Sequence, residues 1–165
     1  MRAALPICLL LTACGAADSP QPLPNGAKAD RIVVVKHQGW LTAYDGEHEI
    51  VTFFRIDLGT TDAGRKRFKG DGLTPEGDYL VKRQNLDAAS GCVLHLSYPN
   101  AADRAYAETR GRAAGDGIAV RAKIPMLPRN VRDDWPTDGG IALGYAEMRQ
   151  LCSIVPDGIP ITIRP

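Results

Sequence analysis

Residues 64–79 of the chain read GRKRFKGDGLTPEGDY, a run rich in glycine and in charged side chains. Gly72, Pro75 and Gly77 supply turn conformations just before a strand that we expect at 79–82. The run does not match a phosphate-binding Walker loop, which ends in Gly-Lys-Ser or Gly-Lys-Thr. Nor does it match a calcium loop, whose acids alternate toward a fixed glycine and a distant glutamate. Its residues alone therefore indicate a loop with a structural role.

Two further stretches follow this run. Residues 96–100 read LSYPN with Asp103 after them, and residues 134–143 read DWPTDGGIAL, followed by Glu147 and Met148. Together the three stretches resemble the motifs G-x-K-x₃-G-D-x-x-T-P-E-G-x-Y, Y-P-N-x-x-D and D-W-T-x-G-C-I-A of the YkuD-type L,D-transpeptidase domain, especially its YafK-like murein enzymes. In that family the first motif mainly shapes the sheet and the rim of the pocket.

The resemblance implies a mainly β (β-rich α+β) fold, a single L,D-transpeptidase-like β-sandwich domain with a short C-terminal helix. The residue pattern agrees, because β-branched and aromatic runs are typical of strands and an apolar stripe at helical spacing is typical of a helix. Asp45-Gly46 is a two-residue hairpin signal. Strands are expected at 31–36, 39–44, 48–58, 79–82, 93–98, 118–121 and 159–163, and helices at 103–110 and 145–155.

Composition excludes several classes of protein. The 165 residues are enough for one ordinary domain. The 20 Lys and Arg residues nearly balance 19 Asp and Glu, so no excess positive charge is present to neutralise a nucleic acid. No apolar run reaches the roughly 18 residues that a membrane-spanning helix needs. No Cys or His spacing indicates a zinc site, and we expect neither a metal nor a cofactor.

The N-terminal region has the features of an export signal. Met1-Arg2 carries a positive charge, residues 3–11 are apolar, and Leu11-Thr12-Ala13-Cys14 resembles the bacterial lipobox. We therefore expect a lipoprotein signal peptide at 1–13, a lipid on Cys14 that anchors the protein to a membrane in the bacterial periplasm, a Pro-rich linker at 14–29 and the folded domain at 30–165. Gly15 is not the Asp that resembles an inner-membrane retention signal, which favours the outer membrane. The alternative is ordinary secretion with a later cleavage.

The family's chemistry is acyl transfer from a peptidoglycan stem peptide to a cysteine thiolate, assisted by a histidine on a preceding strand. The resemblance puts Gly140 at the cysteine position and Arg121, 19 residues earlier, at the histidine position. Glycine has no side chain, and arginine does not release its proton in this pH range. The resemblance thus implies no intact catalytic residue. It implies a binding pocket formed by Tyr98, Asn100, Arg121, Trp135, Thr137, Asp138, Gly139 and Gly140.

Two cysteines remain as side-chain thiols once the signal peptide is removed and Cys14 is lipidated. Cys92 and Cys152 could form a disulfide in an oxidising compartment, but sequence does not show how close their Cα atoms lie. Cys92 is also an alternative nucleophile. His95 follows it by three positions, which in a strand places the two side chains on opposite faces and disfavours a catalytic pair.

Three functions stay open. The leading one is a periplasmic, lipid-anchored pseudoenzyme in peptidoglycan maintenance that binds peptidoglycan stem peptides or a cell-wall enzyme. The second is an active transpeptidase or peptidoglycan amide hydrolase with a non-standard nucleophile, for which the candidates are Cys92, Thr137 and Asp138. The third is a structural subunit of the envelope. In the pseudoenzyme, Arg121 would bind a carboxylate of a stem peptide. The alternative is that Arg121 pairs within the chain with Asp133, Asp134 or Asp138.

Overall fold

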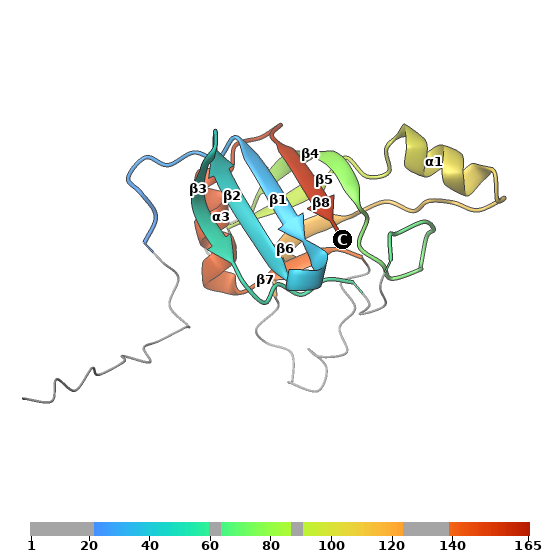
Figure 1. Ribbon diagram of the computed structural model, residues 1–165, viewed down its shortest axis with the longest axis horizontal. Coiled ribbons are helices and arrows are strands. Elements are labelled where there is room, and N and C mark those ends of the chain that lie inside the picture. The colour runs from blue at the N-terminus through green and yellow to red at the C-terminus, as the bar shows by residue number, and fades with distance from the viewer. Residues whose placement is uncertain (1–21, 60–63, 87–90, 124–138) are drawn as a thin grey trace, which may run out of the picture.

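The computed structural model describes residues 22–59, 64–86, 91–123 and 139–165. Eight strands form one curled sheet in the order β3-β2-β1-β8-β4-β5-β6-β7 (Figure 1). The elements are β1 (Arg31–Val35), η1 (Lys36–Gln38), β2 (Trp40–Asp45), β3 (His48–Phe53), β4 (Gly77–Asn85), β5 (Cys92–Leu96), α1 (Ala101–Glu108), β6 (Ala119–Ala122), β7 (Ile141–Leu143), α3 (Tyr145–Ile154) and β8 (Pro160–Arg164). The expected mainly β fold is confirmed.

Strand β4 divides the sheet into two layers. Its first half, residues 77–80, pairs antiparallel with β8, whereas residues 81–85 pair antiparallel with β5. Strands β1, β2, β3 and β8 thus form one half-sheet, and β5, β6 and β7 form the other (Figure 1). Because buried and exposed residues alternate along a strand, the inner faces of both halves share one core. That core includes Ile32, Val34, Leu94, Val120 and Ile161.

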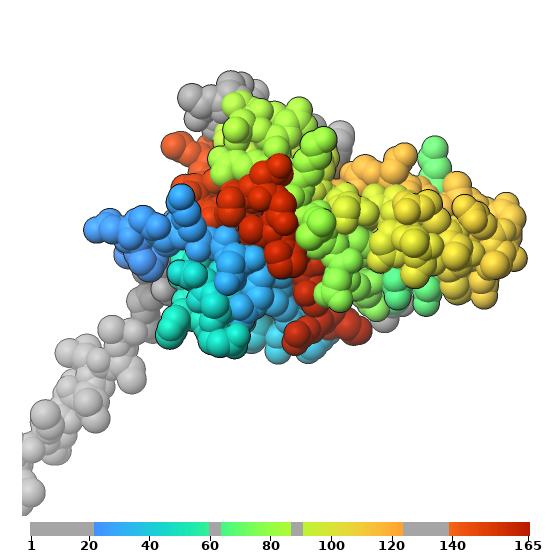
Figure 2. Space-filling view, turned by 90° about the horizontal axis from the view of Figure 1, so that it is seen from above, coloured from blue at the N-terminus to red at the C-terminus, as the bar shows by residue number. Residues whose placement is uncertain are grey.

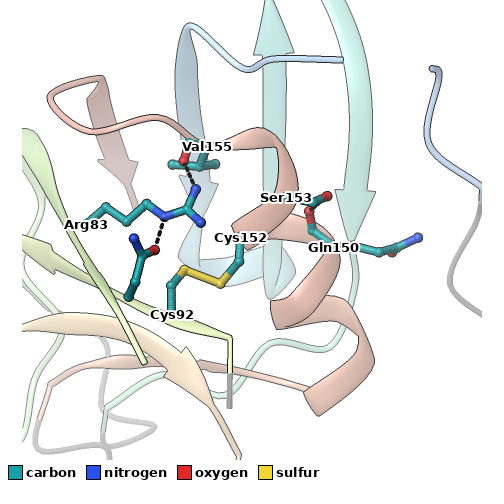
Figure 3. The surroundings of a disulfide bond; sticks show 7 residues. Arg83, Cys92, Gln150, Cys152, Ser153 and Val155 are labelled. Carbon is teal, nitrogen blue, oxygen red and sulfur yellow. Dashed lines mark hydrogen bonds between the residues drawn. A yellow bond between two sulfur atoms is a disulfide. The ribbon is translucent and has the colours of Figure 1, made fainter. Parts of the chain in front are cut away.

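Helix α3 contributes the rest of the core. It packs against β5 and β6, and its buried residues are Met148, Leu151, Cys152 and Ile154. This spacing places them on one stripe of the helix, as the apolar pattern predicted. A disulfide joins Cys152 to Cys92 at the start of β5, with 5.8 Å between the Cα atoms (Figure 3). The bond, left open by the sequence, therefore fixes α3 to the second half-sheet.

Several elements differ from the sequence-based expectation, among them β4, which spans Gly77–Asn85 rather than 79–82. Strand β3 ends at Phe53 rather than continuing to residue 58, because Arg55 has a φ of 56°, which a strand does not accommodate. Helix α1 starts at Ala101, since the Asn100 side chain accepts a hydrogen bond from the Asp103 amide and caps the helix. Strand β7 was not expected, because three residues are too few to show a period.

The folded domain begins before Asp30. Ala29 is buried, and its N–H donates to the carbonyl oxygen of Ile154 at 2.8 Å. Leu23 and Ala27 pack against the core from outside. The expected linker at 14–29 therefore includes residues that belong to the domain, while residues 1–21 lie outside the described ranges. Within those ranges, no helix is long and apolar enough to cross a bilayer.

One part of the molecule projects from the sandwich. We call residues 64–76 and 98–118, which include α1, the α1 lobe. Its two segments are held together by the Phe68 and Tyr106 rings, whose centroids are 6.0 Å apart, and by the Lys69 N–H, which donates to the Ala113 carbonyl at 2.8 Å. The lobe lies at one end of the long axis, and residues 22–29 lie at the other (Figures 1 and 2).

Candidate functional site

The two positions where the resemblance expects a catalytic pair lie on neighbouring strands. Strands β6 and β7 are parallel, with Val120 opposite Ile141 and Arg121 opposite Ala142. Gly140 is buried and comes two residues before Ala142, directly before β7. The structure therefore places Arg121 on the strand beside the one that begins directly after Gly140.

Arg121 faces away from the core of the sandwich. Val120 is fully buried in that core, so the alternation of a strand turns Arg121 and its partner Ala142 to the other face. On the far side of Ala142, Asp57 forms two backbone hydrogen bonds with it, each of 2.8 Å. The small methyl group of Ala142 thus lies between a cationic and an anionic residue.

Asp57 forms an ion pair in the described structure, whereas Arg121 does not. The Asp57 carboxylate pairs with the Lys123 ammonium at 2.9 Å. The Arg121 side chain is half-buried, and within the described ranges no hydrogen bond or ion pair joins its guanidinium to another residue. A half-buried guanidinium without such a partner is suited to bind a carboxylate through two parallel hydrogen bonds. Asp133, Asp134 and Asp138, its alternative partners, lie outside the described residues.

The backbone beside Gly140 is packed so closely that glycine alone fits. Gly139 is buried with a φ of 87°, and a Cβ atom there would lie 2.2 Å from the Leu73 carbonyl oxygen. A Cβ atom at Gly59 would lie 2.0 Å from the Gly72 carbonyl oxygen and 3.1 Å from the Cα atom of Gly139. The loop at residues 70–74 therefore lies directly on the site, which agrees with the rim position that the resemblance implies.

A buried ion pair holds this loop in shape. The side chain of Lys66 is 2% exposed, and its ammonium donates to the Asp71 carboxylate at 2.8 Å. The same carboxylate accepts hydrogen bonds from the amides of Arg67, Phe68 and Leu73. Burial acts to raise the pKa of Asp71, but the hydrogen bonds from Lys66 and these amides outweigh it and lower the pKa. Asp71 therefore organises the loop as an anion.

A second network ties the loop to α1. The buried Asp103 carboxylate accepts hydrogen bonds from the Arg65 guanidinium at 2.8 Å and from the Tyr79 hydroxyl at 3.0 Å. Burial first, and then the negative charge of Asp103, raises the pKa of Tyr79 above its ordinary range. The sequence motifs gave no sign of this network, because its members are 24 and 38 positions apart.

Tyr98 and Asn100, which were expected in the pocket, have structural partners. The buried Tyr98 hydroxyl donates to the Ala114 carbonyl at 2.9 Å, and burial, with the charge of Asp103, raises its pKa to about 12. Asn100 is the N-cap of α1. Of the other expected residues, Arg121, Gly139 and Gly140 come together, whereas Trp135, Thr137 and Asp138 lie outside the described residues.

The disulfide bears on the alternative nucleophile. Cys92 is bonded to Cys152, so it carries no thiol that could ionise. His95 faces the other side of β5 and lies 2.8 Å from the Gln84 side-chain oxygen. Across the described residues, no three His, Cys, Asp or Glu side chains are grouped to hold a metal ion. The chemical group that the described part of the site offers is the Arg121 guanidinium.

Several solved structures have the same architecture. The helical cell shape determining protein Pgp2 from Campylobacter jejuni matches with a TM-score of 0.64 at 21% identity, over 84% of this chain and 48% of that one. An L,D-transpeptidase from Enterococcus faecium matches with a TM-score of 0.53 at 12% identity, over 83% and 50% of the two chains. This chain has the L,D-transpeptidase fold. Bd1075 from Bdellovibrio bacteriovorus shares it with a TM-score of 0.52 at 22% identity, over 83% and 47%.

The similarity to these structures shows the L,D-transpeptidase fold alone. The chain spans about half the length of each of these three structures. No family model matches the sequence, and no curated protein does. Within this fold, Arg121 lies on β6, which pairs in parallel with β7 directly after Gly140.

Proposed function

We propose that this protein is a lipid-anchored periplasmic pseudoenzyme that binds peptidoglycan stem peptides at Arg121 without forming a covalent intermediate. The lipid on Cys14 would hold it to a membrane, with the outer membrane favoured. Its fold is that of L,D-transpeptidases and of a protein that determines cell shape, which supports a role in the cell wall. The domain would bind the ligand of the L,D-transpeptidase family without catalysing the family's reaction.

The observation that carries this proposal is the half-buried guanidinium of Arg121 beside Gly140. Acyl transfer by this fold needs a thiolate and a base at these two positions, and glycine and arginine supply neither. A guanidinium does bind carboxylates strongly, because its planar fork makes two charge-assisted hydrogen bonds. Stem peptides carry carboxylates. The position that the resemblance gives to a proton-transferring histidine would therefore hold an anionic ligand in place.

We expect the substitution Arg121→Gln to weaken the binding of isolated muropeptides at least about tenfold. A hydrogen bond to a charged group contributes about 1.5–3 kcal/mol, and each 1.4 kcal/mol changes the affinity about tenfold. Isothermal titration with purified muropeptides measures the change. Arg121→Lys keeps the charge but not the fork, so its affinity should fall between those of the wild type and Arg121→Gln.

Arg164→Gln is the matched control for this experiment, because Arg164 is exposed on β8 and its loss changes the net charge equally. Its affinity for muropeptides should equal that of the wild type. If Arg121→Gln and Arg164→Gln both bind as the wild type does, Arg121 is not the ligand-binding group and the proposed site is wrong.

A further inference from the structure

Three arginine side chains on the α1 lobe stack on two aromatic rings. The Cζ atoms of Arg110 and Arg67 lie 3.7 Å and 4.1 Å from the centroid of the Tyr106 ring. The Cζ atom of Arg112 lies 3.7 Å from the centroid of Phe68. Cation–π stacking of this kind orders long side chains and leaves the edges of the guanidinium planes open to other partners. We call Arg67, Arg110 and Arg112 the arginine cluster.

The guanidinium groups of the cluster have no acidic partner within the part of the chain that the structure describes. Among the described residues, the side-chain hydrogen bonds of the cluster are those of Arg110 Nη1, which donates to the Tyr106 carbonyl and to the Thr109 hydroxyl. No salt bridge among the described residues includes Arg67, Arg110 or Arg112. Their positive charges are therefore available to an external anion.

The rest of the lobe does not neutralise these charges. Three of its acids are already bound, Asp71 by Lys66, Asp103 by Arg65 and Glu76 by Lys36 outside the lobe. Two acids of the lobe form no ion pair with another described residue, Glu108 and Asp116. Five of its cations likewise form none: Arg67, Lys69, Arg104, Arg110 and Arg112. The lobe therefore carries a local excess of positive charge in a chain whose formal net charge is +1.

The position of the lobe bears on which anion it meets. Residues 22–29, through which the chain leads toward Cys14, lie at the opposite end of the long axis from α1 (Figure 1). Figure 2 shows the lobe, in yellow and orange, projecting from the body of the domain. With the lipid anchor proposed above, the end of the domain nearest the anchor and the lobe are at opposite ends of the molecule. A polymer beyond the membrane is then a better partner than its lipid headgroups.

We infer that the arginine cluster is a second binding surface, separate from Arg121, for the carboxylates of peptidoglycan stem peptides. This inference rests on the proposed function and adds to it. Peptidoglycan repeats its stem peptides along a polymer, so one domain can hold two of them at once. Two weak sites on one polymer give a higher affinity than either site has for a single peptide. The cluster thus favours intact wall over free muropeptides.

The substitution Arg67→Gln/Arg110→Gln/Arg112→Gln tests this inference. We expect it to weaken binding to purified sacculi about tenfold in a co-sedimentation titration, since each exposed charge contact contributes about a two- to threefold change in affinity. Binding of an isolated muropeptide at Arg121 should not change. Conversion of the carboxylates of the sacculi to amides should lower wild-type binding by more than this factor, because it removes the groups that both Arg121 and the arginine cluster would bind.

The matched control is Lys82→Gln/Arg149→Gln/Arg164→Gln, which removes the same charge from exposed positions outside the lobe. It should bind sacculi as the wild type does, and thermal unfolding checks that both variants are folded. If the cluster variant binds sacculi as tightly as the wild type, the inference is overturned and the proposed function still stands. If the wild type itself does not bind sacculi, the proposed function fails. A loss of binding to phosphatidylglycerol vesicles but not to sacculi would overturn the inference in favour of a membrane surface.

Discussion

Replacement of Cys92 and Cys152 by alanine is expected to lower the free energy of unfolding by about 4 kcal/mol. The two residues are 60 positions apart, and a cross-link that closes a loop of this length removes much of the conformational entropy of the unfolded chain. The bond also fixes α3 behind β5 and β6, the strands next to the site. Urea unfolding of the double variant and of the wild type, both without reductant, measures the difference.

Reduction of the wild type with dithiothreitol should lower the free energy of unfolding by about as much as the double substitution does. Ser153→Ala is the control, because Ser153 is exposed beside Cys152 and its replacement should change stability by less than about 0.5 kcal/mol. A double variant as stable as the oxidised wild type would show that the bond contributes nothing to the fold.

The second large effect is expected for Asp71→Ala, at about 3–5 kcal/mol of lost stability. This substitution leaves the ammonium of Lys66 buried, with the Phe68 carbonyl at 3.2 Å as its recorded partner. It also removes the acceptor of three amides. Lys66→Met should lower the stability less, because the Asp71 carboxylate still accepts the hydrogen bonds from the three amides. Chemical unfolding at neutral pH gives both values, with Asp116→Ala as an exposed control that should have little effect.

The contribution of Asp71 should depend on pH in a defined direction. Its pKa is lowered in the folded protein from the ordinary value of 3.8, so the ionised form stabilises the fold at pH values above 3.8. This stabilisation is lost as the pH falls below 3.8 and through the folded-state pKa. The stability difference between the wild type and Asp71→Asn should therefore narrow in that range. A difference that stays constant from pH 7 to pH 3 would show that Asp71 does not act through its charge.

The sequence predicted the fold where local patterns are strong. The β-branched run of β1 predicts a buried strand, and the apolar stripe of α3 predicts an amphipathic helix. Strand β7 could not be found in this way, since three residues between glycines depend on their pairing with β6. The early start of the domain at Ala29 likewise depends on a contact with Ile154, far along the chain.

The candidate site was predictable in part for the same reason. Arg121 lies on β6 and Gly140 directly before the paired strand β7, whereas their role as a binding site stays a prediction. Tyr98 also belongs to a motif, but a motif does not say whether a side chain faces a ligand or the interior, and this one is buried. The pairing of Arg65 with Asp103 joins two motifs across 38 residues and needed the structure.

The central claim is that this domain binds peptidoglycan without cutting or joining it. The most direct test is to incubate the protein from residue 14 onward, with Cys14→Ser so that no lipid can be added, with purified sacculi and to analyse the muropeptides by mass spectrometry. We predict that the protein is retained on the sacculi and that the muropeptide profile does not change. New cross-links, shortened stems or released peptides would contradict the claim and show that an active nucleophile survives.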